Sequence, residues 1–175
     1  METRKSRSRS RGVALAAILA GLYAADVIFF APLSFQAIQV RVADILLPLA
    51  IILGPPAVAG LTLGAFVGNF YASPFGAIDI VGGTIANFVA AALAWYIGRR
   101  RFTGAWIMGI TVEVLSVSLI VGSYLAGLTN TPLWLMVLEI AAGEVVAIGF
   151  GGYIVLKAVN AALERRRPLV PSATT

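Results

Sequence analysis

The sequence predicts an all-α integral membrane protein, folded as a single six-transmembrane-helix bundle. Of its 175 residues, 59% are hydrophobic and 12% are charged, whereas a soluble domain carries about 25% charged residues. The charged residues lie in short groups between long apolar runs, and the mean hydropathy is +0.92. Turn residues divide these runs into six segments suited to membrane helices. We expect the bundle to cover residues 12–163, with a basic cytoplasmic tail at 1–11 and a basic, disordered cytoplasmic tail at 164–175.

The first predicted helix covers residues 12–30, about 28 Å in length, which matches one bilayer core. This run follows a basic segment but is longer than the apolar region of a signal peptide, so we expect it to be retained. Ala16, Ala20 and Ala24 form a row of small residues along it. Such a row lets another helix backbone approach closely. The row predicts either a docking face for a partner protein or packing inside the bundle.

The next two helices are short, because Gly54-Pro55-Pro56 separates them and proline removes a helical donor. They are predicted at 42–54 and 57–71, each about 20 Å long. Since a bilayer core is thicker, they form either two short spans shielded by neighbours or one re-entrant hairpin. The second helix carries a double GxxxG row for tight packing, formed by Gly60, Gly64 and Gly68.

The last three helices are predicted at 77–98, 105–127 and 133–157, and each carries polar residues. Ionisable groups inside a membrane cost about 3 kcal/mol or more on insertion scales, so they usually face a cavity and a partner. The polar residues of these helices are Asp79, Asn87, Glu113, Glu139 and Glu144.

The basic residues predict the orientation of the bundle. Six crossings place both termini and the Arg99–Arg101 group on one side of the membrane, and every Lys and Arg except Arg41 then lies on that side. By the positive-inside rule this side is the cytoplasm. We therefore expect a multi-pass protein of the cell membrane with both termini cytoplasmic. The net charge of +5 is explained by this placement, and no nucleic-acid partner is expected.

The composition excludes several kinds of active site. The chain has no Cys and no His, which removes thiol nucleophiles, His-based triads and zinc sites built on those ligands. It has no G-x-x-x-x-G-K-[ST] loop, so it cannot use ATP by itself. We expect neither an enzyme nor a metal or cofactor site, and the energy for transport would come from a separate ATPase module.

Two segments resemble a known family: IQVRVADILLPLAIILGPPAVAGLTLGAFVGNF, and after it GAIDIVGGTIANFVAAALAWYIG. Together they are similar to the QueT family over about a third of the chain. The Gln-x-Arg-x-Ala-Asp core, the Gly-Pro-Pro break, Gly68-Asn69 and Asp79-Ile80 carry the resemblance, with a weaker match at Gly143-Glu144. Glu113 departs from the family, which has an Asn-centred polar segment there.

QueT proteins are the substrate-binding S components of energy-coupling factor (ECF) importers, proposed to take up queuosine precursors. The resemblance therefore implies an ECF S-component-like bundle that binds its ligand outside and topples in the membrane to release it inside. It also implies a transmembrane coupling protein and two ATPase subunits as partners. In such an assembly the row of Ala16, Ala20 and Ala24 would dock on the coupling protein.

The candidate ligand-binding residues share a polar side chain in the outer half or the middle of the bundle: Gln39, Arg41, Asn69, Asp79, Asn87, Glu113, Glu139 and Glu144. Acids outnumber the single outer Arg, which favours a cationic or donor-rich ligand. A carboxylate accepts two hydrogen bonds side by side, as the edge of a guanine offers them. An aminomethyl substituent would add a cation. These residues suit a 7-deazaguanine such as preQ1 or queuine, or a related small polar compound.

Structural roles are open for several of these residues. Arg41 and Asp44 are three positions apart and can form a pair at a helix mouth. Asn69 can brace the turn after its helix, and Asp79 can lie in the first turn of the next, where a carboxylate meets the positive helix end. Asn87, Glu113 and Glu144 are placed deeper, which favours ligand contact for at least one of them.

Two other functions remain as alternatives to substrate capture. A stand-alone proton- or cation-coupled transporter would use the buried acids as a relay, although the two halves of the chain show no sequence repeat of the kind such transporters have. A membrane enzyme acting on lipids would need clustered acids or a nucleophile near the cytoplasmic face. The acids here are scattered singly, mostly toward the other face, which disfavours an enzyme.

Overall fold

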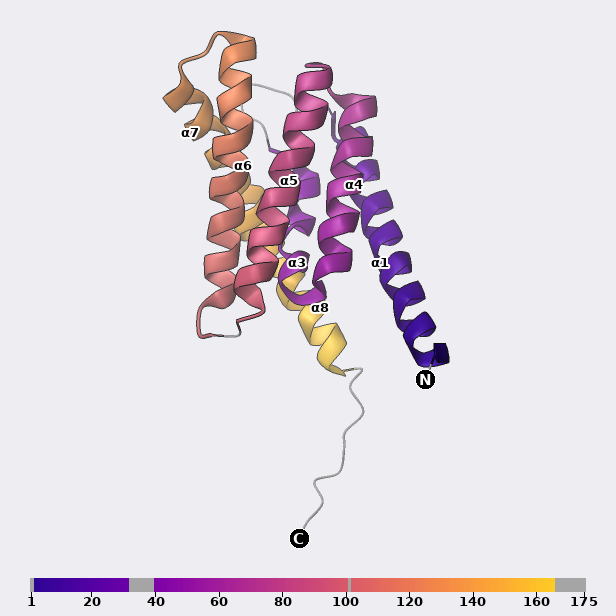
Figure 1. Cartoon of the computed structure of the whole chain (residues 1–175). Helices are drawn as coiled ribbons and strands as arrows, with labels where there is room; N and C mark the ends of the chain where they lie inside the picture. The colour runs from indigo at the N-terminus through magenta and orange to yellow at the C-terminus, as the bar shows by residue number, and fades with distance from the viewer. Residues whose placement is uncertain (1, 32–39, 101, 166–175) are drawn as a thin grey trace.

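The computed structural model describes residues 2–31, 40–100 and 102–165, and within these ranges every regular element is a helix. Gln39, the residues after Arg165 and Arg101 lie outside the described residues. Figure 1 shows α1, α4, α5 and α6 as neighbouring helices in one layer, with α7 beside α6. The segments η1 and α3 pack against this layer, and η2 and α8 pack on them in turn.

Helix α1 spans Glu2–Phe29 and packs along α4, which spans Pro55–Ala72. The helix begins before residue 12, so the segment predicted as a tail continues the first helix. Three glycines of α4 make the contact close. A Cβ on Gly60 would lie 2.5 Å from the carbonyl oxygen of Ala16, and one on Gly64 would lie 2.8 Å from that of Ala20. The GxxxG row therefore packs backbone against backbone.

This contact bears on the row of Ala16, Ala20 and Ala24, for which the sequence predicts two alternative roles. Ala16 and Ala20 meet the glycines of α4, and Ala24 is buried. The row lies against the protein's own helix, because backbone approach needs small residues on both sides. This packing is the intramolecular alternative, and the docking of the row on a partner protein stays a prediction.

The segment predicted as a helix at 42–54 is divided. It consists of the 3₁₀-helix η1 (Val42–Leu46) and the short α-helix α3 (Leu49–Leu53). Gly54 ends it with φ +74°, a conformation open to glycine. Pro55 then starts α4, where a missing backbone donor does no harm. Together η1 and α3 reach about 18 Å, so they remain shorter than a bilayer core.

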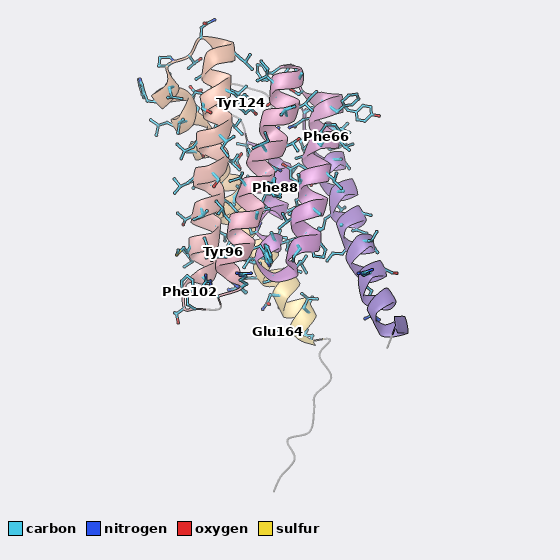
Figure 2. The ribbon with its side chains drawn as sticks, in the orientation of Figure 1. Phe66, Phe88, Tyr96, Phe102, Tyr124 and Glu164 are labelled. Carbon is cyan, nitrogen blue, oxygen red and sulfur yellow. The ribbon has the colours of Figure 1, made fainter. Side chains whose placement is uncertain are left out.

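Helix α5 spans Ala77–Gly98, as the sequence predicts, and α6 spans Ala105–Thr129, two residues beyond the predicted end. The two helices pack together along the middle of the bundle. Both expose large apolar side chains on their outer faces, including Phe88 and Leu119. Figure 2 shows Phe66 and Phe88 on the outer surface of the bundle, as expected for helices that face lipid.

The last predicted helix, 133–157, continues to Arg165 and changes type on the way. It consists of α7 (Leu133–Glu144), the π-helix η2 (Val145–Gly152) and α8 (Tyr153–Arg165). Gly151 and Gly152 of η2 leave room for Ile45 and Pro48, which lie beside them in η1 and directly after it. A π-helix often marks a functional site, and this one begins directly after Glu144.

Four helical stretches of the described chain are long and apolar enough to cross a membrane: Arg9–Phe29, Ala77–Gly98, Ala105–Thr129 and Leu133–Arg165. The other two helices are the short Val42–Leu53 and α4. The chain is thus an all-helical protein with the features of a multi-pass membrane protein. The start of α1, the α5–α6 connection and the end of α8 lie at the same end of the bundle (Figure 1).

Candidate functional site

Buried polar side chains gather between the layers of the bundle, and they form two groups. The first, which we name the Asp79 network, contains Arg41, Asn69, Ser73, Asp79 and Tyr124. The Arg41 guanidinium donates to Asn69 Oδ1 at 2.8 Å, and Asn69 Nδ2 donates to the carbonyl oxygen of Asp79 at 3.4 Å. Asp79 accepts from the hydroxyls of Ser73 and Tyr124, each at 2.5 Å. This network ties the end of α4 to α5 and α6.

Two glycines of α5 leave space for the Asp79 network. A Cβ on Gly83 would lie 2.4 Å from Asn69 Nδ2 and 3.6 Å from a nitrogen of Arg41. A Cβ on Gly82 would lie 2.5 Å from the ring of Tyr124. The network therefore depends on two adjacent positions without side chains. Tyr124 is labelled in Figure 2 near the end of the bundle opposite to Tyr96.

The second group, which we name the acceptor cluster, contains Asp44, Asn87, Glu113 and Glu144. All four side chains are at most 3% exposed. Among the described residues, five of their oxygen atoms meet no hydrogen-bond donor: Asp44 Oδ2, Asn87 Oδ1, both carboxyl oxygens of Glu113, and Glu144 Oε2. A buried acceptor without a donor costs about 1–3 kcal/mol. A core that served only stability would not keep five of them.

Asp44 is the common neighbour of the other three members. Its carboxyl group interacts electrostatically with the Glu144 carboxyl group, and the Tyr23 hydroxyl joins it to the Asn87 amide. It also lies close enough to Glu113 for the two charges to interact. Tyr23 of α1 completes the surroundings, because its hydroxyl donates to Asp44 Oδ1 and accepts from Asn87 Nδ2 at 2.6 Å.

Small residues again bring these elements together. A Cβ on Gly64 would lie 2.7 Å from Tyr23 Cβ, so the glycine lets α1 turn its phenol inward toward Asp44. Gly151 and Gly152 let η1 approach η2, which carries Asp44 toward the end of α7 and Glu144. The acceptor cluster therefore combines η1 with α5, α6 and α7, elements far apart in the sequence.

The residues predicted to bind a ligand separate into groups in the structure. Asn87, Glu113 and Glu144 lie in the acceptor cluster, whereas Arg41, Asn69 and Asp79 lie in the Asp79 network. The structural roles kept open for Asn69 and Asp79 match their hydrogen bonds within the chain. Glu139 is only half buried on α7, and its carboxyl group enters neither network. Gln39 lies outside the described residues.

Four residues in or beside the two groups are absent from the predicted ligand set: Asp44, Ser73, Tyr124 and Tyr23. The sequence predicts Asp44 only as a partner for Arg41, yet it is the centre of the acceptor cluster. Tyr23 and Tyr124 look like ordinary aromatic residues of apolar helices, and only their hydroxyl groups distinguish them from packing residues. Tyr23 lies one position before Ala24 of the small-residue row, which indicates that it points near the tightly packed side of α1.

The cluster does not resemble a metal site. No group of three or more carboxylate ligands suited to a metal ion occurs in the described part of the chain. What the cluster offers instead is a set of acceptors that can take hydrogen bonds from a donor-rich molecule. Among the described residues, the charge of Arg41 interacts with both groups, which contain four buried acids, Asp44, Asp79, Glu113 and Glu144.

The comparison with protein families identifies a relationship over most of the chain. The family described as QueT transporter matches residues 13–161. This match extends well beyond the third of the chain that carries the resemblance in the sequence. No match was found among curated proteins or among solved structures.

Proposed function

The chain belongs to the QueT transporter family, and from this premise we propose that it is the substrate-capture subunit of an ATP-driven ECF importer. Its ligand is a queuosine precursor, a 7-deazaguanine such as preQ1 or queuine. The single observation that carries the proposal is the acceptor cluster. Five buried acceptor atoms that meet no donor among the described residues suit a guest that brings donors, because a charge-assisted hydrogen bond forms at each site the guest fills.

Glu113 carries the recognition of the ring in this proposal. Both of its carboxyl oxygens are open and its side chain is fully buried. A carboxylate of this kind accepts two parallel hydrogen bonds, and the ring N–H and amino group of a guanine edge supply two parallel donors. A site that leaves buried acceptors unpaired strongly rejects analogues without the matching donors. The Asp79 network braces the helices around this contact.

The orientation follows from the basic end of the bundle. Arg99 and Arg100 lie at the end where α1 starts, and their guanidinium groups stack on Tyr96 at 4.5 and 5.0 Å. Basic and aromatic residues of this kind anchor a cytoplasmic membrane face. We place both termini in the cytoplasm, with six crossings in which η1–α3 and α4 form two short spans.

The partners in this proposal are a transmembrane coupling protein and two ATPase subunits. Because α4 covers the row of Ala16 and Ala20, docking uses the neighbouring face of α1. Ala17, Gly21 and Ala25 are exposed there, and a Cβ on Gly21 would meet no atom within 4 Å. Small exposed residues let a partner helix approach the backbone of α1.

The experiment that tests the function is ligand binding to the purified, detergent-solubilised protein. We expect mass spectrometry of co-purified small molecules to find a 7-deazaguanine, and calorimetry to show that it binds. Glu113→Gln removes the charge of the acceptor and gives it a donor, so we expect affinity to fall about tenfold or more. Glu139→Gln is the matched control on a half-buried acid outside the cluster, and its affinity stays unchanged.

Vesicle uptake distinguishes the importer from the stand-alone transporter. With the coupling protein and ATPases present, uptake requires ATP. Uptake by this chain alone, driven by a pH gradient, contradicts the importer and supports a carrier that uses its buried acids as a relay. Absence of any binding to 7-deazaguanines contradicts the proposed ligand.

A further inference from the structure

Two different chemistries lie side by side in the acceptor cluster. Glu113 presents two open oxygens from one carboxyl group. Asp44, Glu144 and Asn87 instead present one open oxygen each, from η1, α7 and α5. The first arrangement suits a flat edge with two parallel donors. The second suits a compact group whose donors point in several directions.

The Asp44 and Glu144 carboxyl groups need something between them. They lie close enough for their charges to interact, and Asp44 Oδ2 and Glu144 Oε2 meet no donor in the described part of the chain. Two ionised carboxylates this close repel, so the pair is stable only with a shared proton or a cation. Both side chains are at least nine-tenths buried, which makes solvent a poor substitute.

Among the described residues, the charged and titratable groups around the pair include one cation, Arg41. Tyr23 of α1 donates to the other oxygen of Asp44, and Glu113 of α6 adds negative charge. Arg41 interacts with both carboxylates and also donates to Asn69. Its single charge is shared with Asp79 as well. The region therefore keeps an excess of negative charge that a ligand cation would reduce.

We infer that Asp44, Glu144 and Asn87 form an ammonium subsite, distinct from the ring contact of Glu113, which selects ligands that carry a primary amine. An ammonium group has three N–H donors, and the subsite has three open acceptors. This inference rests on the proposed function and deepens it. It assigns the side chain of the ligand, rather than its ring, to the meeting point of η1 and η2.

The test compares two ligands with the same ring, 7-aminomethyl-7-deazaguanine and 7-cyano-7-deazaguanine. The first carries an ammonium group at neutral pH and the second carries a neutral nitrile. We expect the wild-type protein to bind the aminomethyl compound about tenfold or more tightly than the nitrile, because loss of a charge-assisted hydrogen bond has that effect. Equal affinities, or tighter binding of the nitrile, overturn the inference.

The variant Glu144→Gln then tests whether the ammonium subsite causes the preference for the aminomethyl compound. The substitution keeps the size of the side chain and removes its charge. We therefore expect weaker binding of the aminomethyl compound and unchanged binding of the nitrile, so that the ratio of the two affinities falls toward one. Asp44→Asn is the second variant, so the result does not depend on the folding of one protein. Glu139→Gln on the same helix α7 is the matched control and keeps the wild-type preference. Thermal unfolding in detergent confirms that each variant is folded.

The outcomes separate the inference from the proposed function. If both compounds bind the wild type and both variants keep the full preference, the ammonium subsite is wrong while ring recognition stands. If Glu144→Gln and Asp44→Asn weaken both compounds equally, the pair supports the fold rather than the amine, and the inference is again overturned. If neither compound binds the wild type, the proposed ligand fails and the subsite fails with it.

Discussion

Tyr23 is the residue that joins α1 to the acceptor cluster. It is fully buried, and its hydroxyl lies between Asp44 and Asn87. It donates to one oxygen of Asp44, while the other oxygen meets no donor among the described residues. Because the same hydroxyl accepts from the Asn87 amide nitrogen, it also fixes which end of that amide stays open. Tyr23 is therefore a positioning residue for the proposed ligand site.

Tyr23→Phe tests this role with the loss of one oxygen atom. The ring still fills its place beside Gly64, but Asp44 loses a donor and Asn87 loses an acceptor, a cost of about 1–3 kcal/mol for each buried group. We expect ligand affinity to fall about tenfold. Calorimetry measures the affinity, and Tyr71→Phe on an exposed phenol is the control. An affinity equal to that of the wild type contradicts the positioning role.

The sequence identifies the polar residues, but it does not show which of them bond to each other and which are left for a ligand. Asn69 and Glu113 are equally conspicuous in apolar helices, and each has a plausible ligand role. The structure gives Asn69 a donor and an acceptor within the chain, whereas the Glu113 carboxyl oxygens meet no partner among the described residues. That difference depends on which residues of other helices face them. Spacing along one helix cannot supply this information, because the contacts come from η1 and α5.

The glycines of helix α4 determine how closely the neighbouring helix α1 packs against it. Gly60, Gly64 and Gly68 let α1 approach over the length of the helix. In lipid, such contacts supply packing energy that apolar burial does not, since lipid tails are as apolar as leucine. The α1–α4 contact also sets the depth at which Tyr23 enters the bundle. The packing of two helices and the geometry of the site are thus linked.

Gly64→Leu is expected to separate α1 from α4 and to reduce binding as well as stability. The new side chain would meet Tyr23 Cβ, which an added Cβ alone approaches to 2.7 Å. Overpacking of this kind costs about 1–3 kcal/mol or more. Thermal unfolding in detergent and ligand calorimetry measure the two effects. Gly127→Leu places the same residue in open space on α6, and a loss of stability there equal to that of Gly64→Leu would contradict the packing argument.

Most elements could be predicted from the sequence, but two changes of helix type could not. Gly54-Pro55 marks a helix end by a physical rule that operates within a few residues, and α5 has clear boundaries for the same reason. The 3₁₀-helix η1 and the π-helix η2 carry no such mark. Each forms where it packs against the other, so tertiary contact rather than local preference determines them.

At the scale of the whole molecule, the two ends of the bundle differ in chemistry. Tyr96, Phe102 and Glu164 lie at one end in Figure 2, together with Arg99 and Arg100. Tyr124 and the Asp79 network lie toward the other end. In the proposed function, import begins at the second end and the basic end faces the cytoplasm. The exposed side of α1 runs between them and is available to a partner within the membrane.

Gly21→Leu tests whether that side of α1 docks on a coupling protein. The substitution enters open space, so we expect folding and ligand binding to stay as in the wild type. ATP-dependent uptake in vesicles that contain the full importer falls severalfold, because leucine prevents close backbone approach. Gly127→Leu, also in open space but on α6, keeps its uptake. Normal uptake by Gly21→Leu contradicts docking on this face.

The number of residues in the π-helix η2, which follows Glu144, determines how α8 is rotated about its axis. Each residue added to or removed from a helix turns everything that follows by about 100°. Removing one residue between Val145 and Gly152 would therefore rotate α8 and carry Leu156, now fully buried, out toward the surrounding lipid. Gly151 and Gly152 of the same segment must also stay small, because a Cβ there would lie 2.9 Å from Ile45 and 2.7 Å from Pro48. Homologues that share this fold should accordingly keep the number of residues in this segment and small residues at these two positions.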